Sequence, residues 1–382
     1  MIYLDYNATT PLCAPARAAM EPYLEQHFGN PSSIHRAGRE ARAAIDNARD
    51  QLADLLDVRP NELIFTSGGT EANNLALLGL ARQLAPNGKH LISNRAEHHA
   101  VLRTLEYLQK REGFEVTWLD LSPEGLIDPD QLKTAIRPET ILVSIMTANN
   151  ETGVIQPLEE IAEICRARGV LLHSDMVQSF GKMPGSLTNV NAAAFAAHKF
   201  YGPKGAGLLY LRAGLPLAPV QFGGAHEGQR RPGTENVAAI AGMAAAARFI
   251  TENPPDESEL RDKLWRGIAS IFPQARLNGG GAPRLGNTLN LSFPGHDSET
   301  LLMALDLEGI CASSGSACMV GSVVASHVLL AMGLPVALAA SAVRFSLGKE
   351  NSAAEIEETI AAFARILQRQ SARANRPQHA LV

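Results

Sequence analysis

Apolar and polar positions follow two alternating patterns between about residues 60 and 250. Short apolar runs typical of buried strands are each followed by a longer segment whose apolar residues recur with the 3.6-residue period of a helix. In order, these segments are ELIFTS, EANNLALLGLARQL, HLISN, AVLRTLEYLQKRE, ILVSIM, LEEIAEICRARG, VLLHSD and GAGLLYL. Such alternation is typical of a parallel sheet covered by helices. It predicts the α/β class, with a mostly parallel sheet and helices on both faces.

The pattern changes after residue 250. The segment ITENPPDESE has the proline and acidic composition of a domain boundary. Beyond it we expect a long helix, the strand NTLNLSF, a second helix, a loop with two cysteines, a further helix, the segment SAVRFSLG and a terminal helix. This order predicts a second, smaller α+β domain, with residues 371–382 as a loose tail.

Composition and charge narrow the class of protein. The 382 residues are 46% hydrophobic and 19% charged, which is normal for a globular chain long enough for two domains. A net charge of -5 and the lack of a long Lys/Arg run argue against nucleic-acid binding. The start, MIYLDYNATT, does not have the pattern of a secretory signal, and VAAIAGMAAAARFI is too short to cross a bilayer. We expect a soluble cytoplasmic protein without nucleic-acid or membrane contacts.

One of the four cysteines has an unusual setting. No two cysteines form a CxxC pair, so we expect a reducing compartment, no disulfide framework and no metal site; the four are Cys13, Cys165, Cys311 and Cys318. Cys318 follows the run SSGS, which has the small, polar composition of a loop. A cysteine placed for packing would normally lie in an apolar periodic segment. This stretch alone leaves a reactive thiol and a packing role both open.

Polar residues directly follow the predicted strands, where open α/β sheets bind their ligands. The turn Gly68-Gly69-Thr70-Glu71 leads from a strand into a helix, so its backbone N–H groups and the helix dipole could bind a phosphate. Alternatively, Thr70 only caps the helix. Other strand ends carry His98, His99, Asn149, Asn150 and Asp175.

The segment AFAAHKFYGPKGAG places a lysine between an apolar run and a Gly/Pro-rich turn. Partial burial there would lower the pKa of Lys199 and make its amine a usable nucleophile or base, whereas Lys204 is less constrained. Pyridoxal phosphate needs such a lysine for a Schiff base, an aspartate such as Asp175 for the pyridine nitrogen, and a helix start for the phosphate. The set therefore indicates a pyridoxal-phosphate enzyme.

Motifs along nearly the whole chain resemble those of the cysteine desulfurases of the nitrogen-fixation and iron–sulfur-cluster type, which are fold-type I pyridoxal-phosphate enzymes. The motifs are YLDYNATTP, FGNPSSIH, FTSGGTEANN, AEHHAV, ANNETG, HSDMVQSFGK, AHKFYGPKG, RRPGTEN, SSGSAC and VRFSLG. The resemblance implies an aspartate-aminotransferase-like fold. Residues 15–250 would form the large cofactor domain, and residues 1–14 and 251–382 a small domain with a mobile cysteine loop at about 311–326.

The resemblance also implies a role for individual residues. Lys199 would carry pyridoxal phosphate, Asp175 would pair with the ring nitrogen, and His98 would stack on the ring. Gln178 and Asn150 would bind the ring oxygen and the substrate. The phosphate would be bound by Gly69, Thr70, His198 and Thr234 of a second subunit. The substrate carboxylate would be bound by Asn30 and Arg344. A guanidinium suits that last task because its planar fork can bind two oxygens.

The implied reaction converts L-cysteine to L-alanine and leaves a persulfide on Cys318. A homodimer would then pass this sulfur to a protein acceptor such as an iron–sulfur scaffold. Lys199 would remove the α-proton, and a small, permissive loop would bring the Cys318 thiolate to the substrate sulfur. Because an ordinary thiol has a pKa of about 8.5, a group across the site, which we take to be His98, would activate it.

The sequence departs from the family pattern at three places. Ala196 replaces a phosphate-binding serine. Met176 replaces a small residue and is expected to tighten the ring pocket. Met319 and the pair Val324-Ala325 make the cysteine loop more apolar than usual.

Other functions remain open at this point. An aminotransferase or a selenocysteine or cysteine-sulfinate lyase would share Lys199 and Asp175 but would not need Cys318. A degenerate homologue that serves as a structural partner is disfavoured by the intact motifs. The sulfur could go to iron–sulfur assembly, tRNA thiolation, nitrogenase maturation or DNA phosphorothioation.

Overall fold

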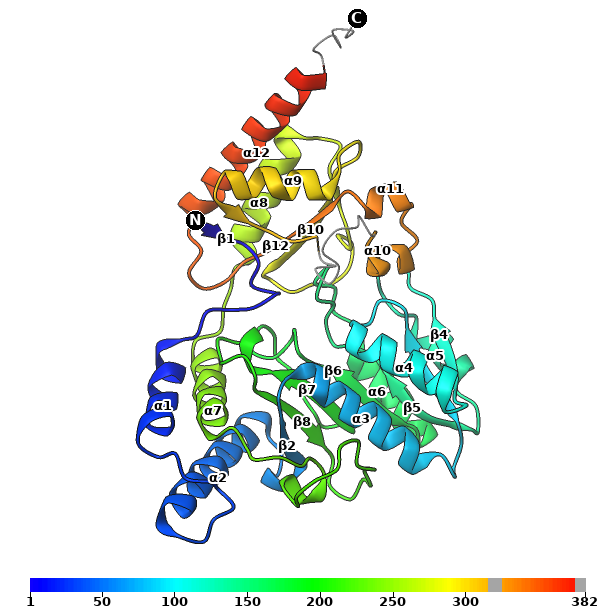
Figure 1. The fold of residues 1–382 in the computed structure, drawn as a ribbon. Helices are drawn as coiled ribbons and strands as arrows, with labels where there is room; N and C mark the ends of the chain where they lie inside the picture. Colours follow the sequence, from blue (N-terminus) through cyan, green and yellow to red (C-terminus); the bar gives the residue numbers. More distant parts are fainter. Residues whose placement is uncertain (315–324, 375–382) are drawn as a thin grey trace, which may run out of the picture.

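The computed structural model describes residues 1–314 and 325–374 (Figure 1). Cys318, the departures at Met319 and Val324, and the predicted tail from residue 375 onward lie outside this part of the chain. No helix in the described ranges is long and apolar enough to cross a membrane.

A seven-stranded sheet forms the centre of the larger body within the described ranges, in the order β2-β8-β7-β6-β5-β3-β4. Its strands are β2 (Leu63–Thr66), β3 (His90–Asn94), β4 (Glu115–Leu119), β5 (Thr140–Ser144), β6 (Leu171–Asp175), β7 (Ala192–Ala196) and β8 (Gly207–Leu211). β8 is antiparallel to β2 and β7, and the other neighbours are parallel. The predicted mostly parallel sheet is confirmed.

Helices cover both faces of this sheet because consecutive strand residues point to opposite sides. Leu91 and Leu142 pack with α3 (Gly69–Leu84) and α4 (His99–Arg111), whereas Ile92 and Val143 belong to a second apolar cluster. That second cluster includes residues of α2 (Arg36–Leu56), α6 (Leu158–Arg168) and α7 (Val237–Glu252). α1 (Ala14–Glu25) packs beside α7, and α5 (Pro129–Ala135) beside α6 (Figure 1). The predicted helical cover is therefore present on both faces.

The smaller body has its own sheet and its own apolar core. β9 (Arg276–Leu277), β10 (Thr288–Ser292) and β12 (Ala342–Ser346) form an antiparallel sheet, and β1 (Ile2–Tyr3) pairs in parallel with β11 (Ile310–Cys311). The helices are α8 (Ser258–Ile271), α9 (Ser298–Leu307), α10 (His327–Ala331), α11 (Val336–Ala339) and α12 (Ala353–Ala374). Because β1 pairs with β11, we propose that residues 1–14 belong to this small domain, as the motifs predict.

Candidate active site

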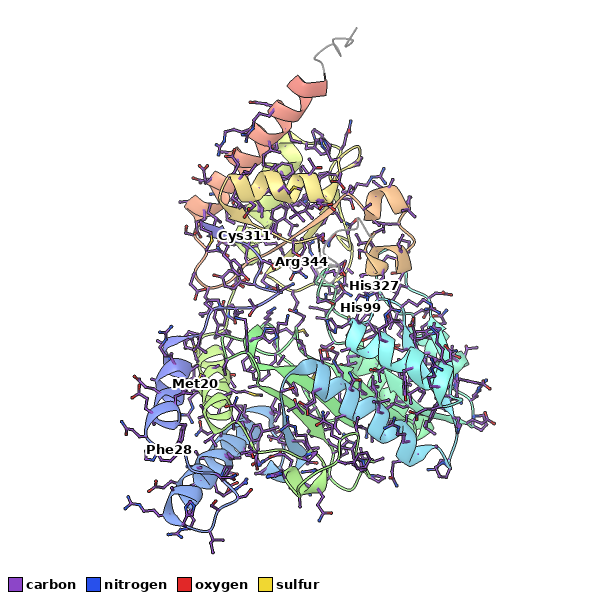
Figure 2. The ribbon with its side chains drawn as sticks, viewed as in Figure 1. Met20, Phe28, His99, Cys311, His327 and Arg344 are labelled. Carbon is purple, nitrogen blue, oxygen red and sulfur yellow. The ribbon has the colours of Figure 1, made fainter. Side chains whose placement is uncertain are left out.

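A cavity of about 360 Å³ lies where the carboxyl ends of several strands meet the small domain. Figure 2 shows His99, His327 and Arg344 between the large sheet and the small domain. The predicted site residues that line the cavity are Gly69, Thr70, His98, Asn150, Asp175, Gln178, His198, Lys199 and Arg344. The fold thus brings together residues from opposite ends of the chain.

Asp175 ends β6 and is held in one orientation. Its Oδ2 accepts a hydrogen bond from Asn73 Nδ2 at 2.7 Å, and its Oδ1 accepts one from the backbone N–H of Val177 at 3.0 Å. Asn73 also lines the cavity, although the sequence reasoning did not single it out. The available signal was its position four residues after Gly69, which places both on one face of α3.

Lys199 lies in a short 3-10 turn, Ala197–Lys199, directly after β7. Its Nζ donates to the backbone oxygens of Asn7 at 2.8 Å and Ala8 at 2.7 Å, so the first residues of the chain form the floor beneath the amine. The neighbouring His198 contacts Thr9 Oγ1 through Nδ1 at 3.2 Å. Burial, with help from the positive charge of Lys199, lowers the pKa of His198 to about 4, so this ring is neutral at neutral pH.

His98 caps α4, and this contact determines which ring nitrogen carries the proton. Nδ1 accepts a hydrogen bond from the backbone N–H of Ala100 at 3.1 Å, so the neutral ring has its proton on Nε2. Burial lowers the pKa of His98; Asp175 opposes this shift and Lys199 adds to it. His98 therefore presents a neutral ring and one N–H donor to the cavity.

Arg344 is a buried guanidinium at the other side of the cavity, 3% exposed. One terminal nitrogen donates to Asp5 Oδ1 at 2.7 Å and the other to the backbone oxygen of Asn150 at 3.0 Å. Its Nε has no hydrogen-bond partner among the described residues. An unpaired buried donor is costly, and both terminal nitrogens of this guanidinium already have partners.

Two of the predicted site residues do not reach the cavity of their own chain. Asn30 and Thr234 are exposed and are not among the lining residues. Asn30 Oδ1 instead accepts a hydrogen bond from the backbone N–H of Ser32 at 2.9 Å. Neither residue therefore contributes to the cavity of its own chain.

Ala196 and Met176, two of the departures from the family pattern, have different outcomes. Ala196 ends β7, is buried and lines the cavity beside Gly69. A Cβ atom placed on Gly69 would lie 3.5 Å from the Cβ of Ala196. Met176 does not line the cavity, and it borders a separate hollow together with Phe180. The prediction that Met176 tightens the ring pocket is wrong, because it points away from the face on which Asp175 lies.

A buried carboxyl group next to His98 was not predicted. Glu97 Oε1 accepts hydrogen bonds from the backbone N–H of Met146 at 2.7 Å and from Asn94 Nδ2 at 2.9 Å, whereas Oε2 has no partner in residues 1–314 and 325–374. Burial raises the pKa of Glu97 to about 8, opposed by these hydrogen bonds and aided by the charge of Asp175. Glu97 is therefore mostly protonated at neutral pH.

Glu97→Gln should make unfolding less dependent on pH. In the unfolded chain this carboxyl ionises near pH 4.5, but in the folded protein it keeps its proton up to about pH 8. Between these values the folded state binds more protons, so wild-type stability falls as the pH rises. We expect the variant to gain about 3.5 kcal/mol relative to wild type between about pH 5 and pH 8, measured by denaturant unfolding. A difference that does not change with pH would contradict this expectation.

The cavity fits pyridoxal phosphate. The start of α3 offers backbone N–H groups to a phosphate, Asp175 can engage a ring nitrogen, and Lys199 can reach a ring aldehyde from the same cavity. A Cβ atom on Gly69 would lie 2.7 Å from Val177 Cγ2, so only glycine lets the helix start come this close. Fold and cavity together define the class of fold-type I pyridoxal-phosphate enzymes.

Comparison with known proteins specifies the class further. The chain belongs to the Aminotransferase class-V family, whose pattern matches residues 2–359. The cysteine desulfurase IscS of Dictyoglomus turgidum is 44% identical over 374 residues, which are 96% of this chain and 95% of the relative. The protein is a cysteine desulfurase that depends on pyridoxal phosphate.

Solved structures agree with this assignment. A structure described as a NifS-like protein has a TM-score of 0.89 and 36% sequence identity, and the match covers 96% of this chain and 99% of that one. The structure of SspA in complex with cysteine has a TM-score of 0.81 and 35% identity, with 91% and 99% of the two chains covered.

Proposed function

We propose that Lys199 holds pyridoxal phosphate covalently, removes the α-proton of L-cysteine and returns a proton to the product. When bound, the cofactor supplies an electron-poor ring that stabilises negative charge on the substrate carbon. Asp175, fixed by Asn73 and Val177, would hold the ring nitrogen in its protonated form. His98 would pack against the ring as a neutral imidazole. Since Ala100 occupies its acceptor nitrogen, we assign His98 to stacking and not to deprotonation of a thiol.

We further propose that the Cys318 thiolate attacks the substrate sulfur and becomes the persulfide. The carbon–sulfur bond breaks, and its electron pair stays on the carbon, which takes up a proton to give alanine. This proposal rests on the positions of the described residues on either side of Cys318. Ser313 exchanges two backbone hydrogen bonds with Arg344, and Ser326 donates from its hydroxyl to the carboxylate of Glu151. Arg344 and Glu151 both line the cavity. The chain therefore leaves and re-enters the described structure beside the site.

The substrate carboxylate is assigned to Arg344. Asp5 and Asn150 hold the guanidinium in place at the cavity that Arg344 lines. Asn150 and Gln178 line the same cavity and are assigned to the substrate and the ring oxygen. The phosphate is assigned to Gly69, Thr70 and His198, with Thr234 from a second subunit.

A homodimer is supported by exposed apolar side chains of the large domain. Phe28 and Ile34, between α1 and α2, are 84% and 91% exposed, and Phe222 is 87% exposed. Ser32 contacts His226 at 3.2 Å, which joins the α1–α2 connection to the segment that carries Thr234. Figure 2 shows Phe28 well away from Arg344 of the same chain. Exposed apolar surface next to Asn30 and Thr234 is expected where a second copy binds.

Hybrid dimers test whether Thr234 acts across subunits. A hybrid of a Lys199→Ala chain with a Thr234→Ala chain contains one site with intact Lys199 and, if the contact is between subunits, intact Thr234. That site should bind the cofactor with wild-type affinity, whereas the Thr234→Ala homodimer should bind more weakly. Weak binding in both, or a monomer by light scattering, would contradict the proposal.

The sulfur acceptor is proposed to be an iron–sulfur scaffold protein in the cytoplasm. This proposal rests on the resemblance of the motifs to the iron–sulfur-cluster type of desulfurase. The test loads the enzyme with labelled sulfur from L-cysteine and then adds a purified scaffold protein or a purified tRNA-thiolation relay protein. Transfer to the scaffold at the higher rate is expected. Preferential transfer to the relay protein would contradict the assignment.

Ala196→Ser should slow the loss of cofactor about fivefold. The new hydroxyl would add a donor near the phosphate, and hydrogen bonds to charged groups contribute roughly 1.5 to 3 kcal/mol. Water would already serve the same oxygen, so the net gain should be about 1 kcal/mol. The measurement is the rate of cofactor dissociation, with Ala196→Val as a control that adds volume without a donor. Unchanged or faster loss from Ala196→Ser would show that packing has already filled this space.

A further inference from the structure

Lys182 lies directly behind two residues that line the cavity. It follows Gln178 by four residues in the turn after β6, and its Nζ donates to Gln178 Oε1 at 2.8 Å and to Asn7 Oδ1 at 3.0 Å. Gln178 and Asn7 line the cavity, but Lys182 does not. Its ammonium group therefore reaches the site only through these two amide side chains.

Placing a cation at this position is energetically costly. Burial lowers the pKa of Lys182 to about 7, the positive charges of Lys199 and Arg344 act in the same direction, and Glu257 opposes them. Within the described ranges no carboxylate forms an ion pair with Lys182, and both of its hydrogen bonds go to amide oxygens. A hydrophobic side chain of similar length would avoid this desolvation cost. The hydrogen bonds to Gln178 and Asn7 are thus what a lysine provides at this position and a hydrophobic side chain would not.

In its charged form Lys182 favours one orientation of the Gln178 amide, because an ammonium group can donate hydrogen bonds but cannot accept them. It shares this role at Asn7, where Asn287 Nδ2 donates to the same Oδ1 at 3.0 Å. Oε1 of Gln178 must face Lys182, so Nε2 lies on the opposite side of the amide, where it donates to the backbone oxygen of Asn7 at 3.0 Å. Oδ1 of Asn7 likewise faces Lys182, and its Nδ2 donates to Thr288 Oγ1 at 2.9 Å. Without Lys182, Oε1 of Gln178 would lose this partner, and the hydrogen bond from Nε2 to the backbone oxygen of Asn7 would be left to hold the amide.

We propose that Lys182 is a positioning residue for the cofactor, which orients Gln178 so that its N–H donor, and not its oxygen, faces the ring oxygen of pyridoxal phosphate. The proposal rests on the function assigned to Gln178 above. A reversed amide would direct an acceptor at the negatively charged ring oxygen and repel it. Lys182 therefore acts on the cofactor through Gln178, without touching it.

The test measures cofactor binding to apoprotein and the visible absorption band of the bound cofactor, neither of which depends on turnover. Lys182→Met and Gln178→Leu should each weaken binding about tenfold, as expected for loss of one hydrogen bond to a charged group. The double variant should be no weaker than the weaker single variant, because both changes remove the same contact. Each single variant should also shift the absorption band in the same direction.

Three further variants complete the experiment. Lys182→Arg should restore most of the affinity, because the residue also borders an open hollow with room for a larger cation. Lys182→Gln keeps a hydrogen-bond donor and replaces Lys182→Met in the binding measurements if the methionine variant does not fold. The exposed Lys89, whose Nζ donates to the backbone oxygen of Glu112, provides the control Lys89→Met, which should bind like wild type.

Two results would overturn the role of Lys182. One is wild-type binding and an unshifted band in Lys182→Met, and the other is losses that multiply to about a hundredfold in the double variant. Either result would leave the proposed function intact as long as the wild-type protein binds the cofactor. Failure of the wild-type protein itself to bind pyridoxal phosphate would instead contradict the proposed function on which the role depends.

Discussion

Lys199→Ala is expected to abolish the release of alanine from L-cysteine while pyridoxal phosphate still binds, now without a covalent link. The variant loses both the attachment point and the base, so the rate should fall by at least about a thousandfold. Binding should persist because Asp175, His98 and the start of α3 are unchanged and line the same cavity. Alanine release and the absorption spectrum of the dialysed variant measure the two effects.

Lys204 provides the matched control, because it lies five residues further along the chain and is exposed. Lys204→Ala should keep near wild-type turnover. Borohydride reduction of the wild-type protein should fix the cofactor on the peptide that contains Lys199. Cofactor found on Lys204, or on any other lysine, would show that the assignment is wrong.

Cys318→Ser is expected to bind L-cysteine but to release no sulfide in the presence of a reductant. A serine hydroxyl is far too weakly acidic to attack the substrate sulfur, so the loss should again exceed about a thousandfold. Binding of cysteine should still alter the spectrum of the cofactor, because Lys199 and Arg344 remain. Sulfide release and the spectrum after cysteine addition separate these two steps.

The other three cysteines have thiols that are poorly suited to this role. Burial raises the pKa of Cys165 to about 12, and burial also raises the pKa values of Cys13 and Cys311. Such thiols stay protonated at neutral pH and are weak nucleophiles. Replacing any of them by serine should leave sulfide release largely intact, and a large loss in one of these variants would contradict the assignment of Cys318.

Most of the large sheet could be predicted from periodicity, and the exceptions have physical reasons. β4 was missed because it lies at the sheet edge, where its residues are only partly buried and its apolar run is weak. β7 (AAAFA) was also missed as a strand, because alanine has a low strand propensity and its segment was described only as an apolar run. GLLYL was predicted as a strand, but its antiparallel direction was not. The ten residues between β7 and β8 are too few for the crossover that a parallel return requires, so the chain must run back beside itself.

Site residues that lie at strand ends could be predicted from the sequence. Site residues whose role depends on contacts with distant parts of the chain could not. Asp175 and Lys199 directly follow strands, so the sheet places them at one edge. The floor beneath Lys199 comes from Asn7, 192 residues away in sequence, which no local pattern can indicate. Lys182 was missed for a related reason, because its importance depends on burial and on the two amide oxygens that it contacts.

Peptide mass spectrometry of the protein after brief incubation with L-cysteine shows which cysteine receives the substrate sulfur. We expect one added sulfur atom on the peptide that contains Cys318, together with alanine in solution. Neither product should form in Lys199→Ala. Added sulfur mainly on Cys311, or persulfide formation that persists in Lys199→Ala, would contradict the roles proposed for Cys318 and Lys199.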